Sequence, residues 1–107
     1  MTYVYLLQSL KTKGLYIGST IDLRRRFDEH NSGKSTFTRR GIPWKLIYYE
    51  AYLHEDAARE REQQLKFYGQ ALVHLKRRLG RSLIKPTPHS NSKTTTPHFF
   101  HPLLAKK

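Results

Sequence analysis

The chain has 107 residues, and its 20 Lys and Arg against 8 Asp and Glu give a formal net charge of +12 at pH 7. It has no cysteine, which excludes disulfides and thiolate metal sites, and no run approaches the roughly 20 apolar residues of a membrane-spanning helix. We therefore expect one small cytoplasmic domain without a membrane span. Because a cationic surface releases the counterions of a polyanion, the charge favours nucleic acid as the partner.

Two short strands begin the predicted fold. Residues 3–7 and 15–18 are rich in aromatic and β-branched side chains, and the polar stretch 9–14 joins them as a β-hairpin. If positions that sum to 21 pair across a four-residue loop, Tyr5 lies directly opposite Tyr16 and both phenols share one face of the sheet. The two tyrosines form either a structural aromatic pair or part of a site.

A helix follows the hairpin. Thr20 or Asp22 can cap its N-terminus, Leu23 and Phe27 form its buried stripe, and Gly33 ends it.

Arg26 and His30 lie four residues apart at the border of this stripe, so they project from one side of the helix. A guanidinium and an imidazole in that position can reach a phosphate held over the sheet. The alternative is a solvated arginine and an ordinary helix-terminal histidine.

The second half of the pattern predicts a third strand over residues 44–50, a helix over 55–67 and, after a break at Gly69, a basic helix over 70–80. The order ββαβαα predicts an α/β fold of the α+β type, in which helices flank a small three-stranded antiparallel sheet. Cations in the loop before the third strand and on the last helix are candidate nucleic-acid contacts: Lys34, Arg39, Arg40, Lys76, Arg77 and Arg78.

Glu62 occupies an unusual place on the helix predicted over 55–67. Ala58 precedes it by four residues and Leu65 follows it by three, so the carboxylate lies on or beside the apolar stripe. A carboxylate directed at a core needs a partner or a metal ion. The alternative is an exposed ion pair with Lys66, which stabilises a helix by only about 0.3–0.5 kcal/mol.

Composition divides the chain near residue 83. Residues 1–83 contain 16 basic and all 8 acidic residues, whereas residues 84–107 contain 4 basic residues, no acidic ones, and many Pro, Ser, Thr and His. The second stretch shows neither a helical nor a strand period. The prediction is a domain over 1–83 and a flexible basic tail over 84–107.

The ordered motifs resemble the GIY-YIG nuclease superfamily, and in particular its short single-domain bacterial members. The resemblance covers about residues 1–80. It rests on motifs whose order and spacing match the family: Tyr3-Val4-Tyr5, Tyr16-Ile17-Gly18, Arg26-x-x-x-His30-Asn31-x-Gly33 and Glu62-x-x-Leu65-Lys66.

The resemblance implies a role for each candidate residue. Tyr5 matches the tyrosine that acts as general base or orients the attacking water, and Tyr16 matches the one that positions that water or the phosphate. Arg26 matches the arginine that neutralises phosphate charge, and His30 a histidine that assists proton transfer in some branches. Glu62 matches the single acidic ligand of Mg²⁺ or Mn²⁺. Nearby positive charge is expected to lower the pKa of the tyrosine base.

The resemblance therefore implies a metal-dependent endonuclease that acts on nucleic acid, DNA more than RNA, with DNA repair as one setting. Since phosphate contacts position without specifying sequence, we expect structure-guided or non-specific binding. The alternative is a DNA- or RNA-binding module of the same fold with little or no cleavage. A basic protein that associates with ribosomes or another partner is a third hypothesis, and a protein partner or homodimer stays open.

Overall fold

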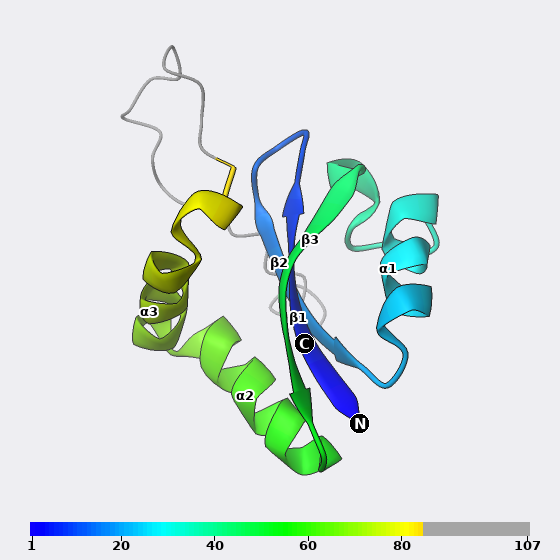
Figure 1. The fold of residues 1–107 in the computed structure, drawn as a ribbon. Helices are drawn as coiled ribbons and strands as arrows, with labels where there is room; N and C mark the ends of the chain where they lie inside the picture. Colours follow the sequence, from blue (N-terminus) through cyan, green and yellow to red (C-terminus); the bar gives the residue numbers. More distant parts are fainter. Residues whose placement is uncertain (85–107) are drawn as a thin grey trace.

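The computed structural model describes residues 1–84 (Figure 1), so the predicted tail lies outside the described residues apart from Ile84. The sheet has the order β2-β1-β3, with both neighbouring pairs antiparallel. This confirms the predicted fold class and element order. The elements are β1 (Thr2–Ser9), β2 (Leu15–Thr20), α1 (Leu23–Ser32), the 3₁₀ helix η1 (Arg39–Gly41), β3 (Trp44–Tyr52), α2 (Glu55–Phe67), α3 (Gly69–Leu79) and the 3₁₀ helix η2 (Gly80–Ser82).

The hairpin register differs from the prediction. Tyr5 pairs with Gly18, and Tyr16 pairs with Leu7. The four-residue loop starts one position later than predicted, after Ser9, whose Oγ accepts hydrogen bonds from two backbone N–H groups of the turn and donates one to the carbonyl of Gly41. Because the pairing slips by two residues, both tyrosines keep the shared face that the prediction gave them.

Capping fixes the bounds of α1. The Asp22 side chain accepts a hydrogen bond from the N–H of Arg25, which satisfies one of the free donors at the helix start. Gly33 follows the helix with φ 86°, a left-handed conformation that suits glycine, and its N–H returns to the carbonyl of Glu29. Of the two predicted caps, Asp22 is therefore the one used.

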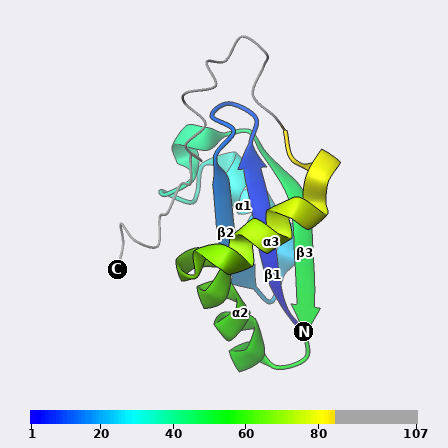
Figure 2. The same ribbon diagram turned by 90° about the vertical axis from the view of Figure 1, so that its left-hand side faces the viewer.

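The helices cover opposite faces of the sheet (Figures 1 and 2): α1 packs on one face, and α2 and α3 pack on the other. On the α1 face, Tyr5, Leu7 and Trp44 are buried together. The alternate residues of β1, Val4 and Leu6, point to the α2–α3 face. The core there is completed by Leu15, Ile17, Ala58, Leu65, Leu72 and Leu75.

The second half of the fold has two further features. The break between α2 and α3 lies at Tyr68, which is extended (φ −114°, ψ 96°), and Gly69 already belongs to α3, so the predicted break at Gly69 is wrong by one residue. β3 continues to Tyr52, two residues beyond its predicted end, where the Tyr52 hydroxyl donates to Glu50.

A polar cluster ties α2 to the edge strand β3. The guanidinium of Arg61 on α2 donates to both carboxylate oxygens of Glu50 at 3.0–3.1 Å. The hydroxyls of Tyr48 and Tyr52 donate to the same carboxylate. Because both partners of the ion pair are mostly shielded from solvent, with side chains 21% and 15% exposed, the cluster fixes the position of α2 on the sheet.

The described part of the chain ends against β1. The side chain of Gln8 accepts a hydrogen bond from the N–H of Ile84 at 2.7 Å and donates one to its carbonyl at 3.1 Å. Within residues 1–84 no helix combines the length and apolar character that crossing a membrane requires.

Candidate active site

A cleft of about 620 Å³ opens at the β2 edge of the sheet, between α1 and α2. Tyr5, Tyr16, Arg26 and Glu62 all line it. They come from β1, β2, α1 and α2, so residues far apart in sequence meet where two helices from opposite faces approach one edge strand. Four of the five residues predicted to act in catalysis or metal binding thus share one cleft.

The two phenols lie side by side at the cleft wall. The ring centroids of Tyr5 and Tyr16 are 6.2 Å apart, and Tyr5 is only 2% exposed. Burial raises the pKa of both hydroxyls above the usual value, and the mutual influence of the two phenols adds to this for Tyr5. The positive charge of Arg26 acts in the opposite direction but does not overcome burial. Among the groups of the chain itself, burial therefore outweighs the lowering of the tyrosine pKa that was expected from positive charge.

Gly18 gives Tyr5 the space that it occupies. A Cβ at position 18 would lie 2.5 Å from the Tyr5 hydroxyl oxygen and 2.7 Å from the adjoining ring carbon. A Cβ atom does not approach another heavy atom that closely in proteins, so any side chain at position 18 would displace the Tyr5 phenol. The glycine of the Tyr16-Ile17-Gly18 motif therefore positions Tyr5 by having no side chain.

His30 lies behind the cleft rather than in it. Its side chain is fully buried, its Nε2 lies 2.8 Å from the Tyr5 hydroxyl, and its Nδ1 lies 2.8 Å from the Thr38 hydroxyl. Burial, with the charge of Arg26 as a second cause, lowers the pKa of His30 to about 4. The imidazole is therefore neutral at pH 7 and touches Tyr5 instead of the cleft space.

Arg26 reaches the cleft from α1. Its guanidinium donates to Glu29 at 2.9 Å, and its side chain stays 35% exposed. The neighbouring Arg25 is more exposed, at 71%, and lies farther from the same carboxylate, at 3.8 Å. Arg26 is thus held beside the phenols while it keeps access to solvent, as a phosphate ligand requires.

Glu62 faces Arg26 from the opposite wall. Its Oε1 accepts a 2.5 Å hydrogen bond from the Ser19 hydroxyl, and its Oε2 forms an ion pair with Lys66. The Glu62 and Lys66 side chains are only 15% and 6% exposed, so the predicted alternative of an exposed surface pair is wrong. The pair itself is present, and it lies inside the cleft.

The donor set at Glu62 suits a hard divalent cation, because the carboxylate and the Ser19 hydroxyl offer only oxygen. Residues 1–84 contain no group of three or more His, Asp or Glu side chains arranged to hold a metal ion. A site built on one carboxylate fits Mg²⁺, which keeps several waters as ligands. The ammonium of Lys66 has to leave Oε2 before a cation can approach it.

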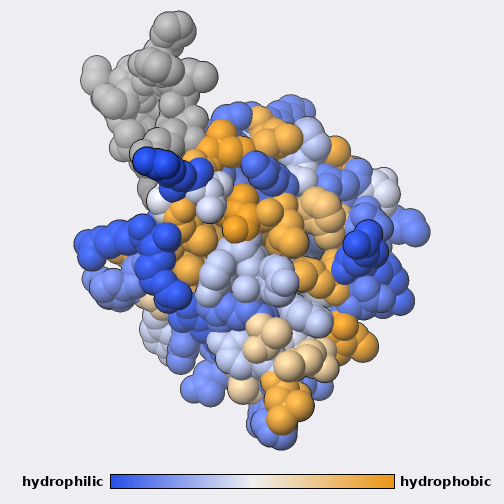
Figure 3. Space-filling model, viewed as in Figure 1, coloured by the Kyte–Doolittle hydropathy of each residue, from blue (hydrophilic) through white to orange (hydrophobic). Residues whose placement is uncertain are grey.

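The predicted nucleic-acid contacts fall into two sets. Lys34 lines the cleft, and Arg39 and Arg40 are exposed in η1 nearby on the α1 side. Lys76, Arg77 and Arg78 belong to α3, which covers the opposite face (Figure 1). Figure 3 shows hydrophilic side chains on both flanks of the molecule, with a more apolar band between them along β3. The structure therefore does not unite the six cations in one surface.

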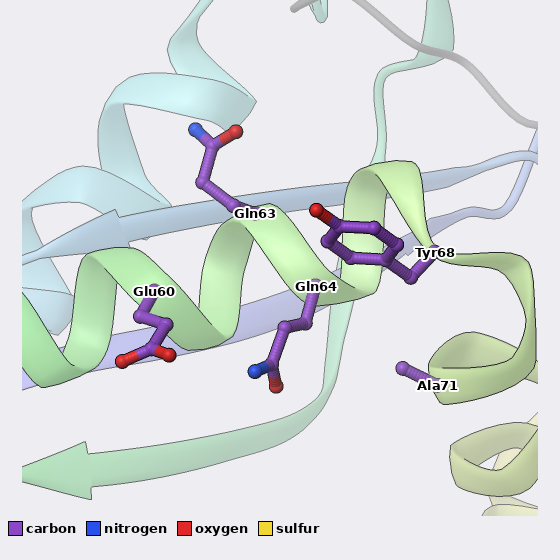
Figure 4. Close-up of a pocket in the computed structure, with 5 residues that line it drawn as sticks. All are labelled: Glu60, Gln63, Gln64, Tyr68 and Ala71. Carbon is purple, nitrogen blue, oxygen red and sulfur yellow. The ribbon is translucent and has the colours of Figure 1, made fainter.

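A second cavity, of about 520 Å³, lies at the junction of α2 and α3 (Figure 4). None of the predicted site residues lines it. The cavity is lined by Glu60, Gln63, Gln64, Tyr68 and Ala71. Gln63 projects from α2 on the opposite side from Glu60 and Gln64.

Two polar residues that contact the site were not predicted from sequence: Ser19 donates to Glu62, and the Thr38 hydroxyl contacts His30. Lys66 was predicted as a partner of Glu62, but on the surface rather than in the cleft. A hydroxyl residue in a turn or loop, such as Ser19 or Thr38, is common enough that its partner cannot be deduced from sequence.

The sequence of the chain is similar to those of known proteins. The model of the GIY-YIG catalytic domain matches residues 1–71. A UPF0213 protein of Haloquadratum walsbyi is 37% identical over 67 residues, which cover 62% of this chain and 74% of that protein. A UPF0213 protein of Streptococcus pyogenes serotype M3 is 40% identical over 65 residues, covering 60% and 70%. The solution NMR structure of a UPF0213 protein from Bacillus halodurans is 29% identical, covers 91% of this chain and 99% of that chain, and has a TM-score of 0.44.

Proposed function

We propose, because the chain belongs to the family of GIY-YIG catalytic domains, that it is a metal-dependent endonuclease that hydrolyses phosphodiester bonds, in DNA rather than RNA. The observation that supports this proposal is the convergence of Tyr5, Tyr16, Arg26 and Glu62 in one cleft. Phosphodiester hydrolysis needs an oriented water, charge neutralisation on the phosphate and help for the leaving oxygen. These four side chains offer the matching groups.

Each group has a task that its surroundings suit. The Tyr5 oxygen orients the attacking water, and the hydroxyl of Tyr16 beside it holds that water or a phosphate oxygen. Arg26 binds the non-bridging oxygens, since its guanidinium is charged, planar and accessible. Glu62, with Ser19 beside it, would hold Mg²⁺ or Mn²⁺, which when bound withdraws negative charge from the phosphate and the leaving oxygen.

The binding mode follows from charge. Phosphates attract the cations around the cleft without any reading of bases, so we propose recognition of backbone shape rather than sequence. A branched, flapped or single-stranded substrate fits such recognition. Guidance of the cut by a protein partner or by a second copy of the chain is compatible with this binding mode.

One observation favours a second function. Both Glu62 oxygens already have partners, Ser19 and Lys66, so the ion pair competes with any cation. If Lys66 does not leave, the cleft holds a phosphate backbone but cannot cut it. The second candidate is therefore a nucleic-acid-binding module with the same fold and negligible cleavage.

The decisive experiment compares Glu62→Gln with Glu60→Gln. Both variants remove one carboxylate from α2, but Glu60 is exposed and lines the second cavity instead of the cleft. Branched, flapped and single-stranded DNA and RNA are incubated with Mg²⁺ or Mn²⁺, and nicked products and binding affinity are measured. We expect Glu62→Gln to lose cleavage by roughly 10²-fold or more and keep binding, while Glu60→Gln cuts as the wild type does.

Two results would contradict the nuclease proposal. Undiminished cutting by Glu62→Gln would remove Glu62 from the site. A wild type that binds every substrate and cuts none, with either metal, would instead establish the binding module.

A further inference from the structure

A chain of buried polar groups continues from Tyr5 away from the cleft. The Tyr5 hydroxyl contacts Nε2 of His30, the His30 Nδ1 contacts the Thr38 hydroxyl, and the Thr38 Oγ1 lies 3.4 Å from the carbonyl oxygen of Ser35. His30 and Thr38 are both fully buried, so solvent supplies no alternative partner. The direction of each hydrogen bond is therefore decided within the chain.

Two directions are conceivable, and they correspond to the two neutral tautomers of the imidazole. If Nδ1 carries the proton, it donates to Thr38, and Nε2 accepts from the Tyr5 O–H. If Nε2 carries the proton, it donates to the Tyr5 oxygen, and the Thr38 hydroxyl donates to Nδ1. Because the two tautomers place the Tyr5 proton differently, they give the cleft a different surface.

The Ser35 carbonyl, the last group in this series of hydrogen bonds, distinguishes the two tautomers. The Ser35 carbonyl accepts from the Thr38 N–H at 3.3 Å and also lies 3.4 Å from the Thr38 hydroxyl; a hydroxyl that donates to it leaves its own oxygen as the acceptor for Nδ1–H. The other end agrees, since Arg26 beside Tyr5 is a pure donor and matches a Tyr5 oxygen whose lone pairs are free. Every group then has a complementary partner.

We propose that Thr38 is a positioning residue that holds His30 in the Nδ1-protonated tautomer, so that Tyr5 presents lone pairs rather than a proton to the cleft. The role of Tyr5 toward water rests on the proposed nuclease function; the tautomer does not. A Tyr5 oxygen with free lone pairs accepts a hydrogen bond from a water molecule and so orients its oxygen toward a phosphate. With the opposite tautomer, the Tyr5 O–H would turn away from His30.

Burial raises the pKa of Tyr5, so the phenol does not ionise readily to act as a base. The Nδ1-protonated tautomer of His30 removes the need for a free phenolate. When the water attacks, its proton passes to the Tyr5 oxygen while the original Tyr5 proton passes to Nε2 of His30. One O–H bond of water breaks, one N–H bond forms, and no free phenolate accumulates. A phosphate bound at Arg26 offsets the charge that contributes to the lowered pKa of His30 and thereby favours the transfer.

The tautomer is measured directly on the full-length protein labelled with ¹⁵N-histidine, by long-range ¹H–¹⁵N correlation at pH 7. We expect Nδ1 of His30 to appear protonated and Nε2 unprotonated. His54 and His74, which are exposed, serve as internal references in the same spectrum. A protonated Nε2 in the wild-type protein would overturn the proposal, whether or not the protein cuts nucleic acid.

Variants then separate Thr38 from Tyr5 as the cause. Thr38→Val keeps the shape but removes the hydroxyl, so the Nε2-protonated form should appear, and Thr38→Ser should restore the wild-type tautomer. Tyr5→Phe removes the other partner and should leave Nδ1 protonated. An unchanged tautomer in Thr38→Val, or a changed one in Tyr5→Phe, would overturn the assignment to Thr38.

Cleavage supplies a further readout. For a substrate that the wild type cuts, Thr38→Val should lower kcat by roughly 10²-fold or more and leave KM unchanged, as loss of the correct histidine tautomer does in serine proteases. Thr38→Ser should recover most of that loss. Equal kcat in the valine variant would overturn the functional part of the proposal.

Discussion

At the scale of single residues, His30 links the stability of the protein to pH. The imidazole is fully buried against Tyr5 and Thr38. Burial is the main cause that lowers its pKa from 6.5 to about 4, and the charge of Arg26 is the second. Glu29 has a smaller, opposing effect. Below pH 6.5 this histidine becomes protonated in the unfolded chain, whereas in the folded chain it stays neutral down to about pH 4. The contribution of His30 to the free energy of unfolding is therefore complete above pH 6.5 and is lost as the pH falls from 6.5 to about 4.

We predict that the free energy of unfolding of the wild type falls by about 2 kcal/mol more than that of His30→Gln between pH 7 and pH 5. Urea denaturation at both pH values measures it. Comparison with the variant removes the contributions of the acidic residues and of the other five histidines, which both proteins share. Parallel pH profiles would show that the folded protein accommodates a charged His30.

The sequence predicted which residues gather in the cleft better than it predicted their surroundings. Motif spacing identified Tyr5, Tyr16, Arg26 and Glu62, and the structure brings all four together. Burial could not be deduced, because whether His30 at the border of a helical stripe faces solvent or core depends on the loop that covers it. That loop, with Thr38 at its end, has no periodicity from which its path could be predicted.

At the scale of elements, the position of α2 decides where Glu62 lies, and the Glu50–Arg61 cluster holds α2 on β3. Arg61 is adjacent to Glu62 in sequence, so the ion pair lies one residue from the predicted metal ligand. Removing Arg61 leaves the shielded Glu50 carboxylate without its cationic partner, which is more costly than removal of an exposed pair.

We predict that Arg61→Met lowers the free energy of unfolding by about 2 kcal/mol or more. Its matched control, Arg59→Met, should cost less than about 0.5 kcal/mol, because the Arg59–Glu55 pair lies on the same helix with side chains 70% and 60% exposed. Denaturant unfolding of both variants provides the comparison. Equal losses would mean that the cluster does not hold α2 in place.

The element pattern was largely predictable, and its errors have local causes. Periodicity gave every strand and helix of the ββαβαα order, because each element has one buried face. The hairpin register failed because the hydrogen bonds of Ser9 decide where the turn closes, and the same loop length is compatible with either closure. Tyr68, rather than Gly69, separates α2 from α3, since a glycine can also begin a helix.

At the scale of the whole molecule, the positive charge lies on two sides of the sheet, and only one side adjoins the cleft. A nucleic-acid backbone that passes over Arg26 reaches Lys34 and the η1 arginines, whereas α3 lies on the other face. The two sets therefore contribute unequally to a strand bound in the cleft, although they contribute equally to net charge.

We predict that replacing Arg39 and Arg40 with Gln weakens binding more than replacing Arg77 and Arg78 with Gln. Each variant removes two charges, so long-range attraction is matched. For duplex DNA the slope of log affinity against log salt should fall by up to about 1.8 in the loop variant, since two phosphate contacts are lost, and by less in the α3 variant. Salt titrations by fluorescence anisotropy measure this, and the reverse order would place the backbone on α3.

The space at Gly18 makes two positions of this chain inseparable. The phenol of Tyr5 occupies the volume that a Cβ at position 18 would need, so neither position can be altered without regard to the other. In this sheet, a larger residue at position 18 fits only together with a smaller one at position 5. Any redesign of this hairpin must therefore treat positions 5 and 18 as one site.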